Sequence, residues 1–210
     1  ELYINEGDLT FKEDAKTFGL DDASNSTQAM FFDFDKDGDL DMFLLNHNIT
    51  VINEIEFDHA RSMRHPTAGD KLYRNEGGKF TDVSEKAGIK GNAMGFGLGI
   101  TASDLNGDGW IDIYVSNDYI ENDYIYINNG DGTFSEKMTD MLQHLSHFSM
   151  GLDIADMNND GLVDIFTLDM LPEDNKRQKL LYGPENYEQY ALMVNRGFYH
   201  QNMRNMLQLN

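Results

Sequence analysis

Aspartates are concentrated in a nine-residue stretch, DFDKDGDLD at 33–41, which contains five of them. Three of these side chains, Asp33, Asp35 and Asp37, alternate along a segment short enough to bring their carboxylates together. Two such charges about 4 Å apart, at an effective dielectric constant of about 20, repel each other by about 4 kcal/mol. A bound cation removes this cost. Because the stretch offers oxygens and no Cys or His, it predicts a hard cation, and a mixture of carboxylates and backbone carbonyls favours calcium over magnesium.

The same loop occurs three times. The other copies are DLNGDGWID at 104–112 and DMNNDGLVD at 156–164, and all three have Asp at positions one, five and nine, Asp or Asn at position three and Gly at position six. A second motif accompanies them: LYINEGDLTF at 2–11, LYRNEGGKF at 72–80 and YINNGDGTF at 126–134. Successive loops start 71 and 52 residues apart, and successive tyrosines of the second motif are 70 and 53 residues apart. Two markers with one spacing indicate an internal repeat of about 50 residues, as in propellers and other arrays.

Each repeat has the pattern of β-structure. An apolar stretch precedes each loop, and the strand-like runs MFLLN, IYVSN and IFTLD follow the last aspartate of each loop. The alternating segment YIYIN at 124–128 ends in a hairpin signal, and a fourth strand is expected from the Lys-Phe or Thr-Phe pair onward. Four short strands per repeat, unable to bury their faces alone, predict an all-β fold of four-stranded antiparallel propeller blades.

The chain is expected to be a segment of one larger propeller. Residues 1–26 would end one blade, 27–90 would form a blade with an insertion at 46–69, 91–140 a second blade, and 141–210 an incomplete blade. The first insertion is expected to be a long hairpin or loop. A helix is predicted from Pro172, and another at 185–196 after Gly183 and Pro184, which gives a short helical insertion at 172–197 near the C-terminus. A four-bladed ring closed by the N-terminal half-blade is the alternative.

Composition narrows the classes of function. The chain has 37 acidic and 16 basic residues, a net charge of −21 at pH 7, which argues against nucleic acid and anionic membrane surfaces as partners. Cysteine is absent, so disulfides and thiol chemistry are excluded. No apolar run approaches the length of a membrane span, so no direct membrane insertion of this segment is expected.

With these loops, this spacing and the stretch GFGLGITASDLNGDGWIDIYVSND at 95–118, the chain resembles the FG-GAP or VCBS-type repeats of integrin α-subunit-like β-propellers. The third repeat and the tail also resemble bacterial VCBS-repeat surface proteins related to the cartilage acidic protein family. The resemblance implies a calcium ion in each of the three loops, on the outer part of a blade. The implied side-chain ligands are Asp33, Asp35, Asp37 and Asp41; Asp104, Asn106, Asp108 and Asp112; and Asp156, Asn158, Asp160 and Asp164. Position seven, which is Asp39, Trp110 or Leu162, is implied to contribute its backbone carbonyl.

The EF-hand is a different calcium loop with a similar start. It requires an acid at position twelve and a helix after the loop. Position twelve is Leu44, Val115 or Thr167 here, and strand-like runs follow. The EF-hand is therefore excluded.

Three other features have structural alternatives. Gly95, Gly97 and Gly99 are spaced as in part of a dinucleotide loop, but no helix follows, so close packing of strands near the propeller axis is favoured. His144 and His147 could bind zinc, but nothing else in the chain points to zinc, and a structural role is favoured. The Asn-Asp pairs at 117–118 and 122–123 flank a loop, where a role in the turn is favoured over a ligand contact.

These observations and the resemblance predict a non-catalytic, calcium-stabilised binding module or scaffold of a cell-surface or secreted protein, with a protein or glycan partner at the cell surface. The expected location is extracellular or at the cell surface, and the resemblance to bacterial surface proteins implies association with the bacterial outer membrane. The alternatives are an accessory or catalytic propeller of a polysaccharide-acting enzyme and a lectin-like glycan-binding module. No nucleophile elbow, zinc-binding helix or phosphate loop is present in the sequence. An enzyme would have a deep pocket with titratable residues outside the loops, and a lectin would expose aromatic side chains such as Tyr119 or Trp110 on one rim.

Overall fold

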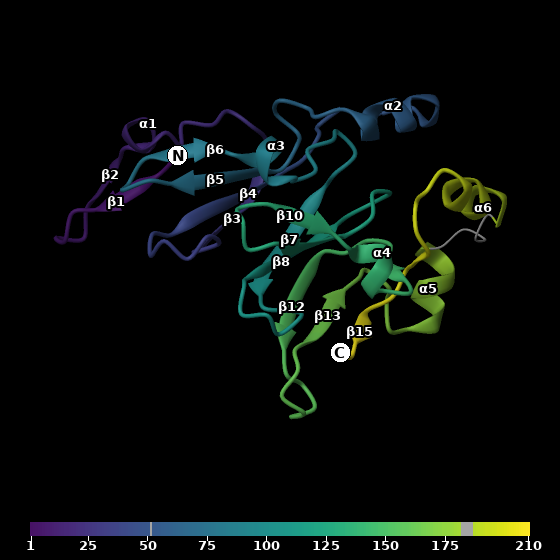
Figure 1. Cartoon of the computed structure of the whole chain (residues 1–210). Coiled ribbons are helices and arrows are strands. Elements are labelled where there is room, and N and C mark those ends of the chain that lie inside the picture. The colour runs from purple at the N-terminus through teal and green to yellow at the C-terminus, as the bar shows by residue number, and fades with distance from the viewer. Residues whose placement is uncertain (51, 182–186) are drawn as a thin grey trace.

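Three antiparallel sheets follow one another along the chain in the computed structural model, which describes residues 1–50, 52–181 and 187–210. Figure 1 shows them side by side, from the purple and blue first sheet through the teal second sheet to the green third one. In each sheet the neighbouring strands are also neighbours along the chain, apart from the last strand of the third sheet, which comes after the tail helices. The sheets form part of a β-propeller, as the repeat predicts.

The strands lie close to the predicted segments. The first sheet contains β3 (Ser26–Phe32), β4 (Asp41–Asn46), β5 (Lys71–Asn75) and β6 (Phe80–Asp82). The second contains β7 (Gly97–Ser103), β8 (Asp112–Asn117), β9 (Tyr124–Asn128) and β10 (Phe134–Glu136). The third contains β12 (Gly151–Ala155), β13 (Asp164–Leu168) and β15 (Met206–Gln208). The N-terminal hairpin of β1 (Tyr3–Asn5) and β2 (Phe11–Glu13) has the same motif as the outer two strands of the complete sheets.

The second strand of the middle sheet, β8, buries both of its faces. On β8, Ile113 and Val115 pack with Phe43 and Leu45 of the first sheet. Tyr114, between them, packs with a second cluster that includes residues of the third sheet. Successive side chains of a strand point to opposite faces of the sheet. Ile113 and Val115 therefore enter one hydrophobic core, and Tyr114 enters the other. A repeat can therefore bury its apolar faces only between two neighbours, as expected of a propeller blade.

Glycine brings the inner strands of adjacent sheets close together. A Cβ added to Gly99 on β7 would lie 2.7 Å from Ser116 Oγ and 3.3 Å from Gly151 Cα on β12. A Cβ added to Gly97 would lie 2.9 Å from Leu45 Cδ2 on β4. Any larger residue would push the sheets apart, which is the packing role favoured for these glycines over a dinucleotide loop.

Short helices connect the sheets, and three of them were not expected from the sequence. The single-turn helices α1 (Ala15–Phe18), α3 (Ser84–Ala87) and α4 (Met138–Met141) follow β2, β6 and β10, the last strand of successive repeats. The first two end at Gly19 and Gly88, both with positive φ. Four residues are too few to produce a helical periodicity in the sequence.

The insertion after β4 differs from its prediction. Instead of a long hairpin or loop, it contains a 3-10 turn, η1 (Glu54–Glu56), and the helix α2 (Phe57–Ser62), which begins with the buried Phe57. The expectation was wrong because the helix is anchored by residues far away in the chain, through Phe57 and Arg61.

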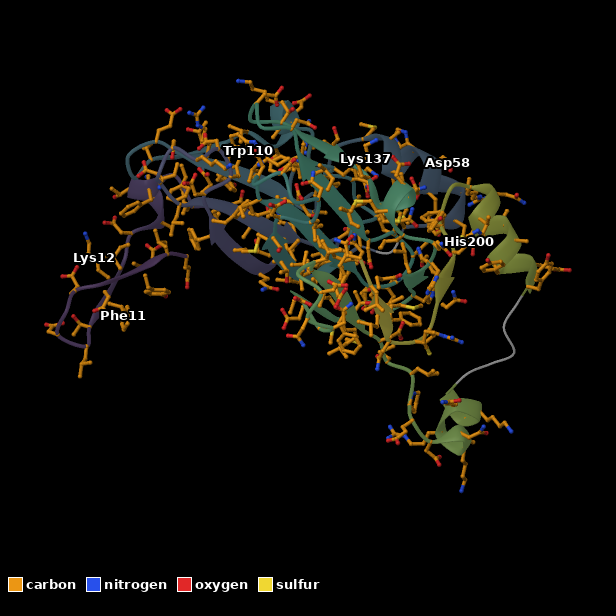
Figure 2. All side chains as sticks on the ribbon, turned by 60° about the horizontal axis from the view of Figure 1, so that its bottom comes forward. Phe11, Lys12, Asp58, Trp110, Lys137 and His200 are labelled. Atoms are coloured by element: carbon orange, nitrogen blue, oxygen red, sulfur yellow. The ribbon has the colours of Figure 1, made fainter. Side chains whose placement is uncertain are left out.

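The tail contains the predicted helices. They are α5 (Asn175–Leu181) and α6 (Tyr187–Asn195), and the predicted break at Gly183 and Pro184 lies outside the described residues. After α6, β14 (Gln201–Asn202) pairs in parallel with β11 (Leu145–Ser146), and β15 then joins β13 as the third strand of its sheet. Figure 2 shows His200 near this end of the molecule, opposite the projecting N-terminal hairpin that carries Phe11 and Lys12.

Candidate metal-binding loops

Each acidic loop joins the first two strands of a sheet. The loops connect β3 to β4, β7 to β8 and β12 to β13. In each sheet the ninth residue of the loop pairs with the last residue before the loop, as Asp41 does with Phe32 in the first sheet. Gly38, in position six, has a φ of 94°, and the sixth residues of the other two loops are also left-handed. Only glycine adopts this conformation without strain, so position six is Gly in all three copies.

The first loop brings three carboxylates together. Asp33, Asp35 and Asp37 each offer an oxygen, and these oxygens lie within 4.8 Å of one another. The Oδ1 atoms of Asp33 and Asp35 are buried and have no hydrogen-bond partner. Burial, and then the neighbouring carboxylate of Asp37, raise the pKa of Asp35. Clustered oxygens without donors fit a bound cation, and the donor set of carboxylates fits calcium.

One cation of the chain already lies beside this group. The Nε atom of Arg74, on β5, is 3.0 Å from Asp35 Oδ2. The Arg74 side chain is 41% exposed, so water weakens this ion pair. The two buried Oδ1 atoms are left without a partner all the same.

The second loop is held by its own amide groups. Asn106 takes position three, and its Nδ2 donates to Asp108 Oδ2 while its Oδ1 accepts from the Asp108 N–H, both at 2.9 Å. Asp104 accepts hydrogen bonds from the N–H groups of Asp108, Gly107 and Gly109. Because an amide replaces one carboxylate, the repulsion in this loop is smaller than in the first one.

The third loop repeats this arrangement. Asn158 Nδ2 donates to Asp160 Oδ2, and Asn158 Oδ1 accepts from the Asp160 N–H, again at 2.9 Å. Asp156 accepts from the N–H groups of Asp160 and Gly161. The first loop is therefore the one with an Asp at position three and a cluster of three close carboxylates.

Position nine fastens each loop to the rest of its sheet. Asp41, Asp112 and Asp164 are fully buried. One carboxylate oxygen of each aspartate accepts a hydrogen bond from the N–H of position two in the same loop. The other oxygen accepts from the N–H of the asparagine that lies at the end of the sheet's third strand or just after it. Burial raises the pKa of Asp41 to about 6 and also raises the pKa of Asp112. These carboxylates have a structural role in the fold, and their part in binding an ion stays a prediction.

Position seven is more variable. The N–H groups of Asp39, Trp110 and Leu162 donate to the position-five carboxylate of the same loop at 2.8–2.9 Å. The side chains have different surroundings: Asp39 Oδ2 accepts from the Gly77 N–H, the Trp110 ring lies below the Lys36 Nζ, and Leu162 is exposed. Figure 2 shows Trp110 at the surface of the molecule. The feature that the three copies share at this position is thus the bond from its backbone N–H, and the implied role of its carbonyl as a ligand stays a prediction.

The asparagine of the second motif bonds to the acidic loops, whereas the sequence interpretation treated it only as part of a hairpin turn. In the second repeat it is Asn128, whose N–H donates to Asp112 and whose Oδ1 accepts from the Gly130 N–H. Its Nδ2 donates to the carbonyl of Ile111 in its own loop and to the carbonyl of Phe34 in the loop of the preceding sheet. The signal in the sequence was the recurrence of this asparagine at 5, 75 and 128, because its distance along the chain from the bonded aspartate varies, with 34 residues from Asp41 to Asn75 and 16 from Asp112 to Asn128.

A second set of buried acids lies at the opposite ends of the second strands. Asp123 Oδ1 accepts from the Asn117 N–H at 2.8 Å, and Asp70 Oδ1 accepts from the Asn46 N–H at 3.0 Å. Burial raises the pKa of each of these two carboxyls to about 7. These bonds close the loop between the second and third strands, so Asn117 and Asp123 have the structural role that was favoured from the sequence.

The histidines considered as zinc ligands do not form a cluster among the described residues. His147 Nδ1 lies 2.9 Å from Gln201 Oε1, and its backbone N–H donates to Asp169. These contacts hold the loop before β12 to the tail, which is a structural role.

Comparison with known proteins gives the same family as the loops. The model of the FG-GAP-like repeat matches residues 61–115 and 104–167, which together make up just over half of the chain. Integrin alpha-3 of Mus musculus is 32% identical over 97 residues, 40% of this chain and 9% of that protein. Integrin alpha-3 of Cricetulus griseus is 30% identical over 126 residues, 48% of this chain and 12% of that protein. The chain thus spans only a small part of these relatives.

The matched residues include the second and third loops, the whole middle sheet and the first two strands of the third sheet. The first loop, outside the match, has the same spacing and the same bonds at position nine. The chain belongs to the FG-GAP-like repeat family.

Proposed function

We propose that the chain is a non-catalytic, calcium-stabilised β-propeller segment that serves as a binding module of a cell-surface or secreted protein. The observation that carries this proposal is the pair of buried oxygens, Asp33 Oδ1 and Asp35 Oδ1, which lack hydrogen-bond partners inside a group of three carboxylates. A buried anionic oxygen without a donor is costly, and a calcium ion removes that cost by direct coordination.

We extend the ligand set to all three loops, with the side chains of positions one, three, five and nine and the backbone carbonyl of position seven. The first loop should bind most tightly, because it has a carboxylate where the other two have Asn106 and Asn158, and affinity rises with ligand charge. One ion per loop would also offset part of the net charge of −21.

Stabilisation by weakly bound calcium supports a location outside the cell. At a free calcium concentration 100-fold above Kd, one site adds about 2.7 kcal/mol to stability. Extracellular modules bind calcium with Kd values of about 10⁻⁴–10⁻³ M, so this stabilisation would be absent at the low calcium concentration of a cytosol. The relatives with integrin names fit a cell-surface location, and the bacterial outer membrane stays a prediction from the resemblance. None of the helices in the described part of the chain has both the length and the apolar character needed to cross a membrane.

The enzyme alternative has less support. One hollow, of 280 Å³, is lined by Arg61, Lys90 and Glu121, among other residues. Glu121 is held there by two hydrogen bonds of 2.9 Å from the guanidinium of Arg61, and Lys90 is paired with Glu136. Each of the three charged side chains thus already has a charged partner, which fits a structural role.

Glycan binding is a second candidate because of Tyr119. Its ring is 52% exposed and packs edge-on against Phe96 and Phe148, so an aromatic surface extends from the residue before β7 to the loop before β12. Aromatic rings of this kind can stack on sugar faces. A glycan array probed with the wild type and with Tyr119→Ala tests this: binding that Tyr119→Ala abolishes supports the lectin-like role, and an array without bound glycans removes it.

The calcium proposal is tested by thermal unfolding in millimolar calcium and in excess EGTA. We expect chelation to lower Tm by many degrees, because up to three sites lose their stabilising ion. Magnesium at the same concentration is the matched control and should restore little, because it requires a tighter octahedral site. An unchanged melting curve in EGTA would overturn the proposal.

A further inference from the structure

The loops of neighbouring sheets are joined by hydrogen bonds. Phe34 lies between Asp33 and Asp35, two proposed ligands of the first loop. Its N–H donates to Asp41 Oδ2 at 3.1 Å, and its carbonyl accepts from Asn128 Nδ2 at 2.8 Å. Asn128 belongs to β9 of the next sheet, so the backbone between two ligands of one loop is held by the next repeat.

The same asparagine holds the second loop. Its backbone N–H donates to Asp112 Oδ1 at 2.8 Å, and Asp112 Oδ2 accepts from the Leu105 N–H at 2.8 Å. Leu105 lies between Asp104 and Asn106, as Phe34 does in its loop. One residue, Asn128, therefore contacts the first loop at the Phe34 carbonyl, and the second loop both at Asp112 and at the Ile111 carbonyl, which accepts from its Nδ2 at 3.2 Å.

The pattern then repeats with equivalent atoms. The Leu105 carbonyl accepts from Asn210 Nδ2 at 3.2 Å, and the Asn210 N–H donates to Asp164 Oδ1 at 3.1 Å. Asp164 Oδ2 accepts from the Met157 N–H at 3.0 Å, in the third loop. A bond pattern that occurs twice with the same atom types is a property of the repeat and not an accident of one contact.

A side-chain contact also joins the first two loops. Lys36 of the first loop, which has a left-handed φ of 59°, places its Nζ 4.0 Å from the centre of the Trp110 ring in the second loop. The ring is also close to Gly130, where an added Cβ would lie 2.9 Å from ring atoms. The ring thus contacts both the turn of its own sheet and a cation of the preceding loop.

We propose that the metal sites of neighbouring blades are positively coupled, with Asn128 and Asn210 as the positioning residues that carry the coupling. This inference rests on the proposed calcium binding. An ion that holds Asp33 and Asp35 orders Phe34 between them and so fixes the acceptor of Asn128, and the ordered Asn128 fixes Asp112. The second loop then loses less conformational freedom when it binds its own ion, which raises its affinity. By linkage, an ion in the second loop raises the affinity of the first loop by the same factor.

Terbium luminescence measures the second loop separately. Tb³⁺ takes oxygen ligands as calcium does, and Trp110, the single tryptophan of the chain, lies in that loop and can sensitise a Tb³⁺ ion bound beside it. The first loop is disabled by Asp37→Asn, an exposed position. We expect the Kd of the second loop, from titration of the sensitised luminescence, to rise about threefold to tenfold in Asp37→Asn.

The carrier of the coupling is tested in two further backgrounds. Asn128→Ala should make the second loop insensitive to Asp37→Asn. Asn75→Ala is the matched control, because the Nδ2 of Asn75 donates at 3.0 Å to the carbonyl of Leu40 in its own loop and, among the described residues, to no other loop. It should leave the effect of Asp37→Asn intact. Lys36→Met replaces an exposed side chain and should partly reduce the effect of Asp37→Asn on the Kd of the second loop. It is the second test of the coupling if Asn128→Ala does not fold.

The outcomes separate the two proposals. If the wild type gives no saturable sensitised luminescence, the calcium proposal fails and the coupling fails with it. If the luminescence saturates but the Kd of the second loop is the same in the wild type and in Asp37→Asn, calcium binding stands and the coupling is overturned. If Asn75→Ala removes the effect as fully as Asn128→Ala, the coupling stands and the assignment to Asn128 is wrong.

Discussion

A single position distinguishes the first loop from the other two. Position three is Asp35 in the first loop and Asn106 in the second, where the amide donates to Asp108 Oδ2. We expect Asp35→Asn to raise stability in EGTA by about 1 kcal/mol, because a repelling carboxylate becomes a hydrogen-bond donor to Asp37. The gain in stability on adding calcium should fall in the same variant, because one ligand charge is lost.

The reverse exchange, Asn106→Asp, is the control for that prediction. It should lower stability in EGTA and increase the gain on adding calcium. Urea unfolding of both variants, with and without calcium, measures all four quantities. The loss of the Arg74–Asp35 ion pair has a small effect, because Arg74 is 41% exposed. Shifts of the same sign in both variants would contradict the explanation by repulsion.

Asp123 makes stability depend on pH. Burial raises its pKa to about 7, whereas an aspartate in an unfolded chain has a pKa of about 3.9. Between about pH 4 and 7 the folded state therefore holds a proton that the unfolded state has lost, and the free energy of unfolding falls as pH rises through this window. Asp123→Asn stays neutral and keeps an oxygen for the Asn117 N–H, so it should lose less stability over this range than the wild type.

Urea unfolding of metal-free protein, in metal-free buffers at several pH values, tests this, because the release of a bound ion then adds nothing to the pH dependence of stability. Asp131→Asn is the matched control: Asp131 is exposed, and its pKa is lowered by hydrogen bonds from Thr133. It should keep the wild-type decline between about pH 4 and 7. Equal slopes for the wild type and Asp123→Asn would show that Asp123 is ionised in the folded protein throughout this range.

The loops act as joints between strands even without an ion. Asp112 accepts N–H groups from Leu105 in the loop and from Asn128 on β9, so one buried carboxylate holds a loop and two strands. Asp112→Asn would turn an NH₂ group toward one of these donors and leave it unpaired. We expect a loss of about 1–3 kcal/mol in EGTA. Asp108→Asn, at an exposed position of the same loop, should lower the free energy of unfolding by less. Equal losses for the two variants in denaturant unfolding would contradict the role of Asp112 in holding the loop and the two strands together.

At the level of strands and loops, the sequence is informative because its signals are local. The strand-like run MFLLN after Asp41 became β4, and the alternating segment YIYIN became β9. The helix α2 was missed because its formation depends on distant contacts, among them the packing of Phe57 against Phe198.

The metal-binding loops, too, were predictable where their geometry depends on residues close together in the sequence. Spacing alone indicated which oxygens meet in the first loop, since Asp33, Asp35 and Asp37 are neighbours along the chain. The bond from Asn128 to Phe34 joins residues 94 positions apart. Such a bond depends on how one sheet packs against the next, and a local sequence pattern carries no information about that packing.

Across the whole molecule, the two insertions outside the repeat contact each other. Arg61 of α2 donates two hydrogen bonds of 2.9 Å to the carboxylate of Glu121, in the loop between β8 and β9. The same guanidinium lies 4.3 Å from the centre of the Phe198 ring, in the segment after α6. In Figure 1, α2 and α6 lie on the same side of the sheets. One side chain thus joins the first insertion, the middle sheet and the tail.

Arg61→Ala should therefore affect all three parts. Glu121 is 2% exposed, and the loss of its partner would leave a buried charge unpaired, which costs about 3–5 kcal/mol. We also expect faster amide hydrogen exchange both in α2 and around Phe198, because the ring loses its contact with the guanidinium. Adding Glu121→Gln removes the unpaired charge and should recover much of the stability, while the fast exchange around Phe198 should persist. If the double variant also restores slow exchange there, Arg61 acts only as the partner of Glu121, and the insertions are held together by other contacts.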